Sequence, residues 1–207
     1  MTAPAPIVGC SRWNDPNAFY DQLNNPTEHL LKLRSGTWLE TCGPTASLNC
    51  QTSVGNGVDF ETPGGYAPQP EEVLTDWFND ARNFVRMRAA WKGLDPQTVA
   101  GNEVAQWYPL AVDEVFGNRC DFVGALTVPK ALEHLGQGRA IQTCLNKPGH
   151  FIALVAYDPE KKEFIIKDSW GGRWPQGDGF CQRMAWREFE TNTRPLNLVY
   201  YPRGFHG

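Results

Sequence analysis

The order of helical and strand-like segments along the 207 residues predicts one α+β domain, in which a mainly helical half faces an antiparallel β half across a cleft. Two observations support this. Apolar residues recur at helical spacing up to residue 138, and short β-rich segments follow from residue 139. No stretch has the composition of a linker, so residues 1–207 are expected to form a single domain. Its expected parts are an irregular wrap over 1–41, the helical half over 42–138 and the β half over 139–207.

Five helical segments are expected before residue 138. Proline in a first helical turn marks two of them, at Pro44 and Pro129, because its missing N–H has no intrahelical partner there. An acidic first turn and apolar residues at helical spacing mark a third, which begins at Pro70. The other two, near 27–33 and around Pro109, are less clearly marked. The expected ranges are 27–33, 42–51, 70–85, 96–115 and 127–136.

After Gly138 the pattern changes to short segments rich in β-branched and aromatic residues, each bounded by turn residues. A turn at residues 158–162, which contains Pro159, joins the second segment to the third and predicts an antiparallel hairpin. The expected strands span residues 140–145, 151–157, 164–167, 179–184 and 196–201.

The composition argues against several classes of partner. The formal net charge is −4 and the 19 basic residues are scattered, so there is no basic footprint for nucleic acid or for an anionic membrane surface. No apolar run approaches the ~20 residues of a membrane span, and the first residues lack the basic and apolar regions of a secretory signal. We expect no nucleic-acid partner, no membrane span and no signal peptide, and a monomeric chain.

Six cysteines are spread along the chain: Cys10, Cys42, Cys50, Cys120, Cys144 and Cys181. They show neither a Cys-x-x-Cys metal pair nor the density of a disulfide-stapled secreted fold, so most are expected to be small buried hydrophobic residues. His29, His134 and His206 have no carboxylate or cysteine at metal-ligand spacing. We therefore expect neither a metal nor an organic cofactor.

Cys42 differs from the other cysteines in its neighbours. It stands at the expected start of a helix, in the segment ETCGPTA (residues 40–46), where the helix dipole favours a thiolate. His150 begins one expected strand and Asp168 follows the next, so antiparallel pairing places them at the same end of a hairpin. Each residue alone is more often structural. Their combination predicts a nucleophilic Cys42 with His150 as its base and Asp168 as the group that orients His150.

Longer segments around these residues resemble a known clan. FIIKDSWGG (residues 164–172), followed by Trp174 and GDGF (177–180), resembles the papain-like motif in which Asn-Ser-Trp-Gly carries the third catalytic residue. GHFIALVAYD (149–158) resembles the histidine strand of that clan. CGPTA (42–46) is similar to its bacterial branch, the bacteriocin-processing (double-glycine) peptidase-like proteins. The resemblance covers the functional segments, not the whole chain, and implies a papain-like fold and a cysteine peptidase that needs no cofactor.

Two positions depart from the papain-like pattern. The resemblance implies a glutamine shortly before the cysteine, whose side-chain amide helps to bind the oxyanion, but Gly36 stands six residues before Cys42. We assign this role to Gln22, the nearest upstream glutamine; the alternative is a solvated loop residue. The other departure is Asp168, where papain-like enzymes mostly use asparagine. A carboxylate orients an imidazole equally well and stabilises its charged form more strongly.

The reaction expected from these residues is hydrolysis of a peptide or peptide-like amide bond through a thioester acyl-enzyme. Proteins, peptides and the stem or bridge peptides of peptidoglycan all stay open as substrates, in a bacterial or phage setting. The chain would act in the cytoplasm by default, or on a cell wall or target protein after release or injection. Two alternatives stay open: a transglutaminase-like acyltransferase that uses an amine as acceptor, and a catalytically inactive papain-like module for binding or structure.

Overall fold

The computed structural model describes residues 6–20, 42–58, 70–80, 83, 104–147, 149–168 and 181–205. The helices in this part of the chain are α1 (Cys42–Ser53), α2 (Pro70–Asn79), α5 (Val104–Phe116), α6 (Val128–Gly136) and α7 (Trp186–Asn192), with a short 3-10 helix η1 (Pro16–Ala18). The strands are β1 (Val8–Gly9), β2 (Cys120–Gly124), β3 (Ala140–Leu145), β4 (His150–Asp158), β5 (Glu163–Lys167), β6 (Cys181–Ala185) and β7 (Asn197–Tyr200).

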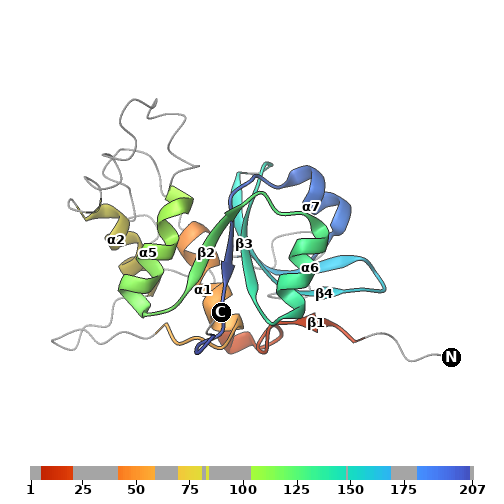
Figure 1. Ribbon diagram of the computed structural model, residues 1–207, viewed down its shortest axis with the longest axis horizontal. Coiled ribbons are helices and arrows are strands. Elements are labelled where there is room, and N and C mark those ends of the chain that lie inside the picture. Colours follow the sequence, from red (N-terminus) through yellow and green to blue (C-terminus); the bar gives the residue numbers. More distant parts are fainter. Residues whose placement is uncertain are drawn as a thin grey trace.

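One antiparallel sheet runs through the middle of the described structure (Figure 1). Its strand order is β2-β7-β3-β4-β5-β6. The long strand β4 pairs with β3 along its first half, from His150 opposite Leu145, and near its end it pairs with the short β1. On its other side β4 pairs with β5, with Ala153 opposite Lys167. The β4–β5 hairpin therefore brings the start of β4 and the end of β5 to the same edge of the sheet.

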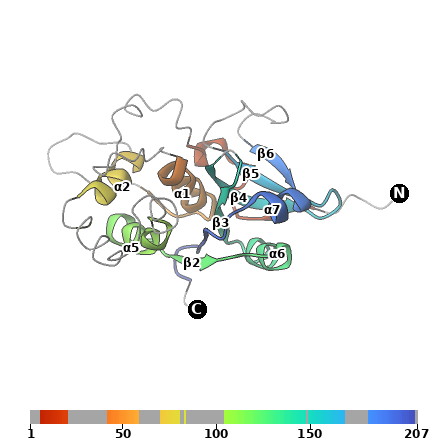
Figure 2. The same ribbon diagram turned by 90° about the horizontal axis from the view of Figure 1, so that it is seen from above.

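Helices cover both faces of this sheet. In Figure 2, α1, α2 and α5 lie on one side of it, whereas α6 and α7 lie toward the other. The side chains of β3 alternate between two cores: Ala140 and Cys144 pack with residues of α1, α2 and α5, and Ile141 and Leu145 pack with residues of α6 and α7. Every residue of β3 and β7 is buried, as expected for central strands covered on both faces.

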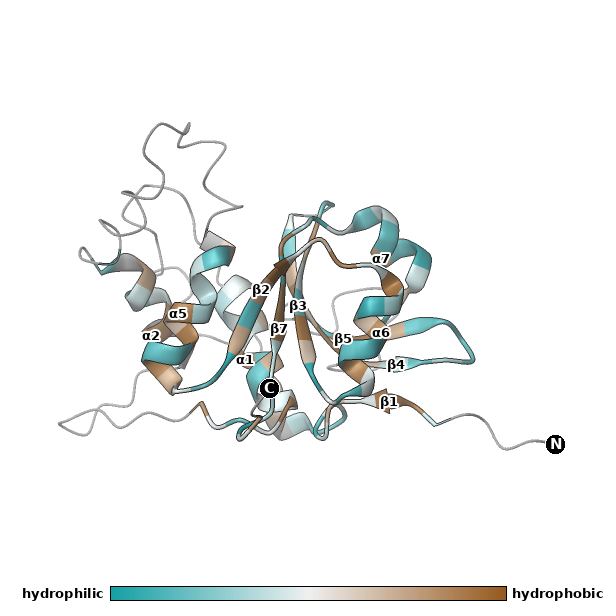
Figure 3. Ribbon diagram, in the orientation of Figure 1, coloured by the Kyte–Doolittle hydropathy of each residue, from teal (hydrophilic) through white to brown (hydrophobic). Residues whose placement is uncertain are grey.

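Helix α1 is unusual because it is wholly buried and yet polar. All twelve of its residues are buried, from Cys42 to Ser53. Figure 3 shows much of α1 in white to teal, whereas β7 is mainly brown. A buried polar side chain costs free energy unless it is hydrogen-bonded, so this helix depends on specific partners rather than on apolar packing alone.

The α+β fold class is confirmed, and the strands expected after residue 138 lie within two residues of their predicted ends. The helices expected from Cys42 and over 127–136 are also found, and the helix expected over 70–85 begins at Pro70 but ends at Asn79. Helix α5 forms the later part of the helix expected over 96–115 and continues through Pro109, while residues 96–103 lie outside the described residues. The segment 27–33 lies outside the described residues.

The sequence did not indicate β2 and α7. Strand β2 is a five-residue segment inside the half expected to be mainly helical. Helix α7 begins after Ala185, which offers no side-chain hydrogen bond to the helix N-terminus, so the usual start signal is missing. Among the described residues, no helix is both long and apolar enough to cross a membrane.

Candidate active site

Cys42 is the first residue of α1. The backbone N–H groups of a first helical turn have no intrahelical acceptor, and the helix dipole makes this end electropositive. The Cys42 side chain is buried, with 4% of its surface exposed. The fold therefore places this thiol at the electropositive end of α1.

His150 and Asp168 come from the neighbouring strands of the β4–β5 hairpin. His150 is the first residue of β4, and Asp168 directly follows β5. The distance from His150 Nε2 to Asp168 Oδ1 is 2.7 Å, and both side chains are fully buried. A hydrogen bond this short, between an imidazole N–H and a carboxylate away from water, fixes the orientation of the ring. The sequence predicted this pairing.

Helix α1 packs against the strand that carries His150. If Gly43, the residue after Cys42, carried a Cβ atom, that atom would lie 3.8 Å from Cδ2 of Phe151. Phe151 is the residue after His150. The immediate neighbours of the two candidate catalytic residues therefore face each other across the contact between α1 and β4. The thiol is carried by a helix and its candidate base by the sheet, which is the arrangement expected from the sequence.

The N-terminal segment is held against both α1 and β5. Asn49 of α1 accepts a hydrogen bond from the backbone N–H of Tyr20 at 2.7 Å and donates one to the Tyr20 carbonyl at 3.1 Å. Thr52 donates to the carbonyl of Ala18 at 3.2 Å. Gln22, the predicted oxyanion donor, follows Tyr20 by two residues and lies outside the described residues.

Lys167 is a buried charged residue whose hydrogen bonds hold the N-terminal segment against β5, and no sequence motif predicts it. Its side chain is fully buried, and its Nζ donates to the carbonyl of Ala18 at 2.7 Å and to that of Arg12 at 3.1 Å. Burial lowers the pKa of Lys167 to about 8. The signal for it was a lysine that ends a run of apolar strand residues directly before Asp168. Its distant carbonyl partners could not be read from the sequence.

The five other cysteines are also free thiols, and four of them are buried. Burial raises the pKa of Cys10 to about 12 and that of Cys181 to about 11. Burial likewise raises the pKa values of Cys50, Cys120 and Cys144. These thiols stay protonated at neutral pH, and a protonated thiol is a poor nucleophile. Within the described residues, no group of three potential ligands could hold a metal ion.

The chain matches the model of the Peptidase_C39 like family over residues 17–192. Among solved structures it is similar to xylellain, a cysteine protease from Xylella fastidiosa, with a TM-score of 0.50 and 14% sequence identity. This match covers 96% of the present chain and 87% of the xylellain chain, and it shows a shared fold. A comparison with curated proteins finds no match. The family match over most of the chain confirms the resemblance seen in the sequence: the protein belongs to the Peptidase_C39 like family, within the papain-like clan of cysteine peptidases.

Proposed function

We propose that this protein hydrolyses peptide or peptide-like amide bonds with Cys42 as nucleophile, His150 as general base and acid, and Asp168 as the residue that orients His150. The observation that carries the proposal is the buried 2.7 Å hydrogen bond between His150 and Asp168, at the edge of the sheet against which the helix of Cys42 packs. Family membership agrees with this chemistry.

The hydrogen bond to Asp168 assigns a role to each ring nitrogen. Nε2 is engaged with Asp168, so Nδ1 is the nitrogen that exchanges a proton with the Cys42 thiol. The thiolate attacks the substrate carbonyl carbon, and the imidazolium returns its proton to the leaving amine as the C–N bond breaks. A water molecule, deprotonated by the same imidazole, then cleaves the thioester and releases the acid. Asp168 stabilises the imidazolium in both half-reactions.

The oxyanion of each tetrahedral intermediate needs hydrogen-bond donors. The backbone N–H of Cys42, at the start of α1, is one of them. We assign the other to the side-chain amide of Gln22. The support is the clamp on Tyr20: its partner Asn49 lies seven residues, or two helical turns, after Cys42 on the same face of α1. Two residues of fully extended chain span at most about 7 Å and a glutamine side chain adds to this reach, so the rise of about 10 Å from Asn49 to Cys42 can be covered.

The proposed reaction, and not the shape of a binding pocket, limits the substrates to molecules that contain a peptide-like amide bond. Peptides, unfolded protein segments and peptidoglycan stem or bridge peptides all present the required amide bond. A bacterial or phage peptidoglycan hydrolase and a protein-processing peptidase therefore share this site chemistry. The two kinds of enzyme are distinguished by which substrate, peptidoglycan or protein, acquires new amino termini.

The test is a search for new amino termini by mass spectrometry after incubation with a synthetic peptide mixture and, separately, with purified peptidoglycan. The expected result is cleavage in at least one of the two, lost in Cys42→Ala and in His150→Ala. Glycine ethyl ester is added in a parallel reaction. If glycine ethyl ester becomes attached to the substrate and no hydrolysis occurs, the protein is an acyltransferase and not a peptidase. No turnover of either substrate class, together with no thioester on Cys42, would contradict the proposal and favour an inactive binding module.

A further inference from the structure

The first turn of α1 is tied to the sheet by a buried glutamine. Gln142 lies in the middle of β3, where its side chain is fully buried. Its Nε2 donates a hydrogen bond at 3.1 Å to the backbone carbonyl of Gly43, the residue next to Cys42. Because Gln142 and Gly43 are 99 residues apart, this bond is a direct tertiary link between the sheet and the helix start.

A second side chain, Tyr200 of β7, fixes the orientation of Gln142. The hydroxyl of Tyr200, on the adjacent β7, donates to Gln142 Oε1 at 2.6 Å. The same hydroxyl lies 2.8 Å from Ser47 Oγ, one turn along α1 from Gly43. Both ends of the Gln142 amide therefore have partners, and the amide cannot rotate without losing them. The network is buried, so each lost bond would leave a polar group without water to replace it.

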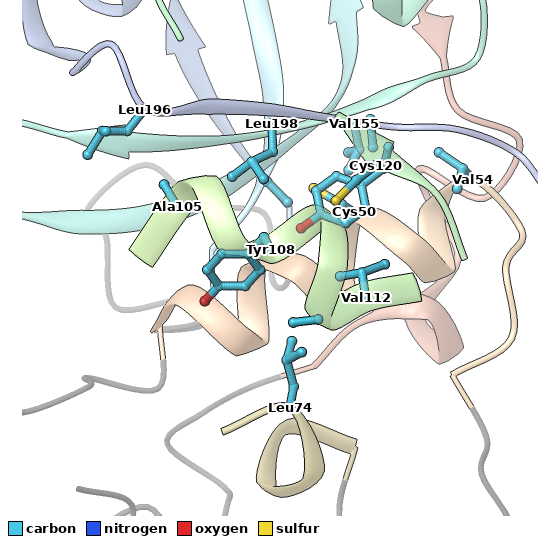
Figure 4. Packing of buried hydrophobic residues seen from close by; sticks show 14 of the residues in the cluster. Cys50, Val54, Leu74, Ala105, Tyr108, Val112, Cys120, Val155, Leu196 and Leu198 are labelled. Carbon is cyan, nitrogen blue, oxygen red and sulfur yellow. The ribbon is translucent and has the colours of Figure 1, made fainter. Parts of the chain in front are cut away.

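Tyr108 of α5 packs against the first turn of α1 beside Gly43. A Cβ added at Gly43 would collide with the Tyr108 hydroxyl, so that hydroxyl occupies the space beside the Gly43 backbone. In Figure 4 the ring of Tyr108 points its hydroxyl toward the start of α1. Burial raises the pKa of Tyr108 well above its usual value, nearby Cys42 adds to this rise, and a hydrogen bond with Gln142 opposes it. Tyr108 thus stays protonated beside the candidate nucleophile.

We infer that Gln142 and Tyr108 are positioning residues that hold the peptide unit of Gly43, and with it the sulfur and backbone N–H of Cys42, in register with His150. They act through the backbone and do not touch the substrate. This inference rests on the proposed function, because it explains the buried contacts around Gly43 by their effect on the neighbouring nucleophile Cys42. A displacement of reacting groups by about 1 Å can cost on the order of 10²-fold in rate, so a fixed first turn matters for this chemistry.

The experiment measures the rate at which iodoacetamide labels Cys42 at pH 6, with each cysteine quantified by mass spectrometry. Wild type and His150→Ala are run first: loss of fast labelling in His150→Ala supports the proposed function itself, and equal rates would contradict that function rather than the positioning role. Tyr108→Phe, which removes one oxygen atom, and Gln142→Leu are then compared with wild type. Both should slow labelling of Cys42 at pH 6 by about tenfold, because the thiolate and imidazolium are no longer held in register.

A matched control separates positioning from general loss of structure. Thr143→Val removes a buried hydroxyl from the next residue of the same strand and should leave the labelling of Cys42 at the wild-type rate. A purely structural defect would instead expose the buried thiols Cys10, Cys50 and Cys120 together with Cys42. If Gln142→Leu exposes all of these thiols, the outcome depends on Tyr108→Phe alone. Labelling of Cys42 at the wild-type rate in a folded Tyr108→Phe would overturn the inference.

Discussion

The two ends of helix α1 carry the same residue type in different surroundings. Cys42 begins the helix, next to the strand that holds His150 and Asp168. Cys50, eight residues later, is fully buried in the core and lies near Cys120 (Figure 4). Burial, together with the neighbouring thiols Cys10 and Cys120, raises the pKa of Cys50 well above its usual value. The position on the helix and the facing elements therefore distinguish two residues of the same type, and the proposed function assigns reactivity to Cys42 alone.

The largest expected difference concerns catalysis. Cys42→Ala should lower the rate of amide hydrolysis by at least about 10³-fold, because the nucleophile is lost. Cys50→Ala should keep activity within about twofold and lower the stability, because a small cavity forms in the core. Hydrolysis rates and urea denaturation of both variants test this. Comparable activity in the two variants would remove the distinction between the two ends of α1.

The next effect concerns the partner of His150. Asp168→Ala should lower activity by about 10²-fold, because it leaves the buried imidazole without its orienting carboxylate. Asp168→Asn keeps a hydrogen-bond acceptor for Nε2 but loses the negative charge, so it should retain more activity than Asp168→Ala, measured as kcat/KM on the same substrate.

Asp158 provides the matched control for Asp168. It ends the same strand that His150 begins, but it pairs with Arg183, 3.1 Å away, and hydrogen bonds from backbone N–H groups of its turn lower its pKa. Asp158→Asn should leave kcat/KM unchanged. A fall of kcat/KM in Asp158→Asn equal to the fall in Asp168→Asn would show that general charge, and not contact with His150, determines the activity.

A stability effect follows from the protonated thiols. A buried thiol with a raised pKa keeps its proton in the folded state after the unfolded chain has begun to lose it near pH 9, so stability falls as the pH rises from about 9 toward the folded values, about 11 for Cys181 and about 12 for Cys10. Lys167 acts in the opposite direction between its lowered pKa, about 8, and the usual lysine pKa of 10.5. Five thiols outweigh one lysine above pH 9.

Urea denaturation at pH 7.5, 9 and 10.5 measures this balance. The expected result is a free energy of unfolding that falls between pH 9 and 10.5. Cys10→Ala should flatten the fall. A free energy of unfolding that stays constant or rises through pH 10.5 would contradict the burial assigned to these thiols.

The smallest effect concerns Lys167, which is near Cys50 and precedes Asp168. Lys167→Met should lower the free energy of unfolding by about 1–2 kcal/mol, because the hydrogen bonds to the carbonyls of Arg12 and Ala18 are lost. The control is Lys130→Met, which removes only an exposed ion pair with Glu133 and should leave the free energy of unfolding nearly unchanged. Equal effects of the two substitutions would show that the clamp on the N-terminal segment contributes nothing.

Much of this molecule could be predicted because its signals are local. Pro44 marks the start of α1, and the turn at residues 158–162 fixes the hairpin that joins β4 to β5. The pairing of His150 with Asp168 followed from that hairpin and needed no knowledge of the tertiary structure.

The parts that the sequence did not reveal depend on residues far apart in the chain. Lys167 reaches the carbonyl of Ala18 across 149 positions, and Gln142 reaches that of Gly43 across 99. A polar residue inside an apolar strand indicates that some partner must exist, but it does not identify the partner. The polar side chains of α1 also have distant partners: Asn49 bonds to the backbone of Tyr20, and Ser47 Oγ lies 2.8 Å from the Tyr200 hydroxyl.

The most direct test of the account compares iodoacetamide labelling of Cys42 and Cys50 across pH 4 to 9, in wild type and in His150→Ala. The account predicts that Cys42 alone labels quickly, that this labelling persists well below pH 8, and that it slows to the rate of an ordinary thiol in His150→Ala, while Cys50 stays protected in both. Labelling of Cys42 that rises only near pH 8.5 and does not depend on His150 would contradict the claim that the two form a catalytic pair.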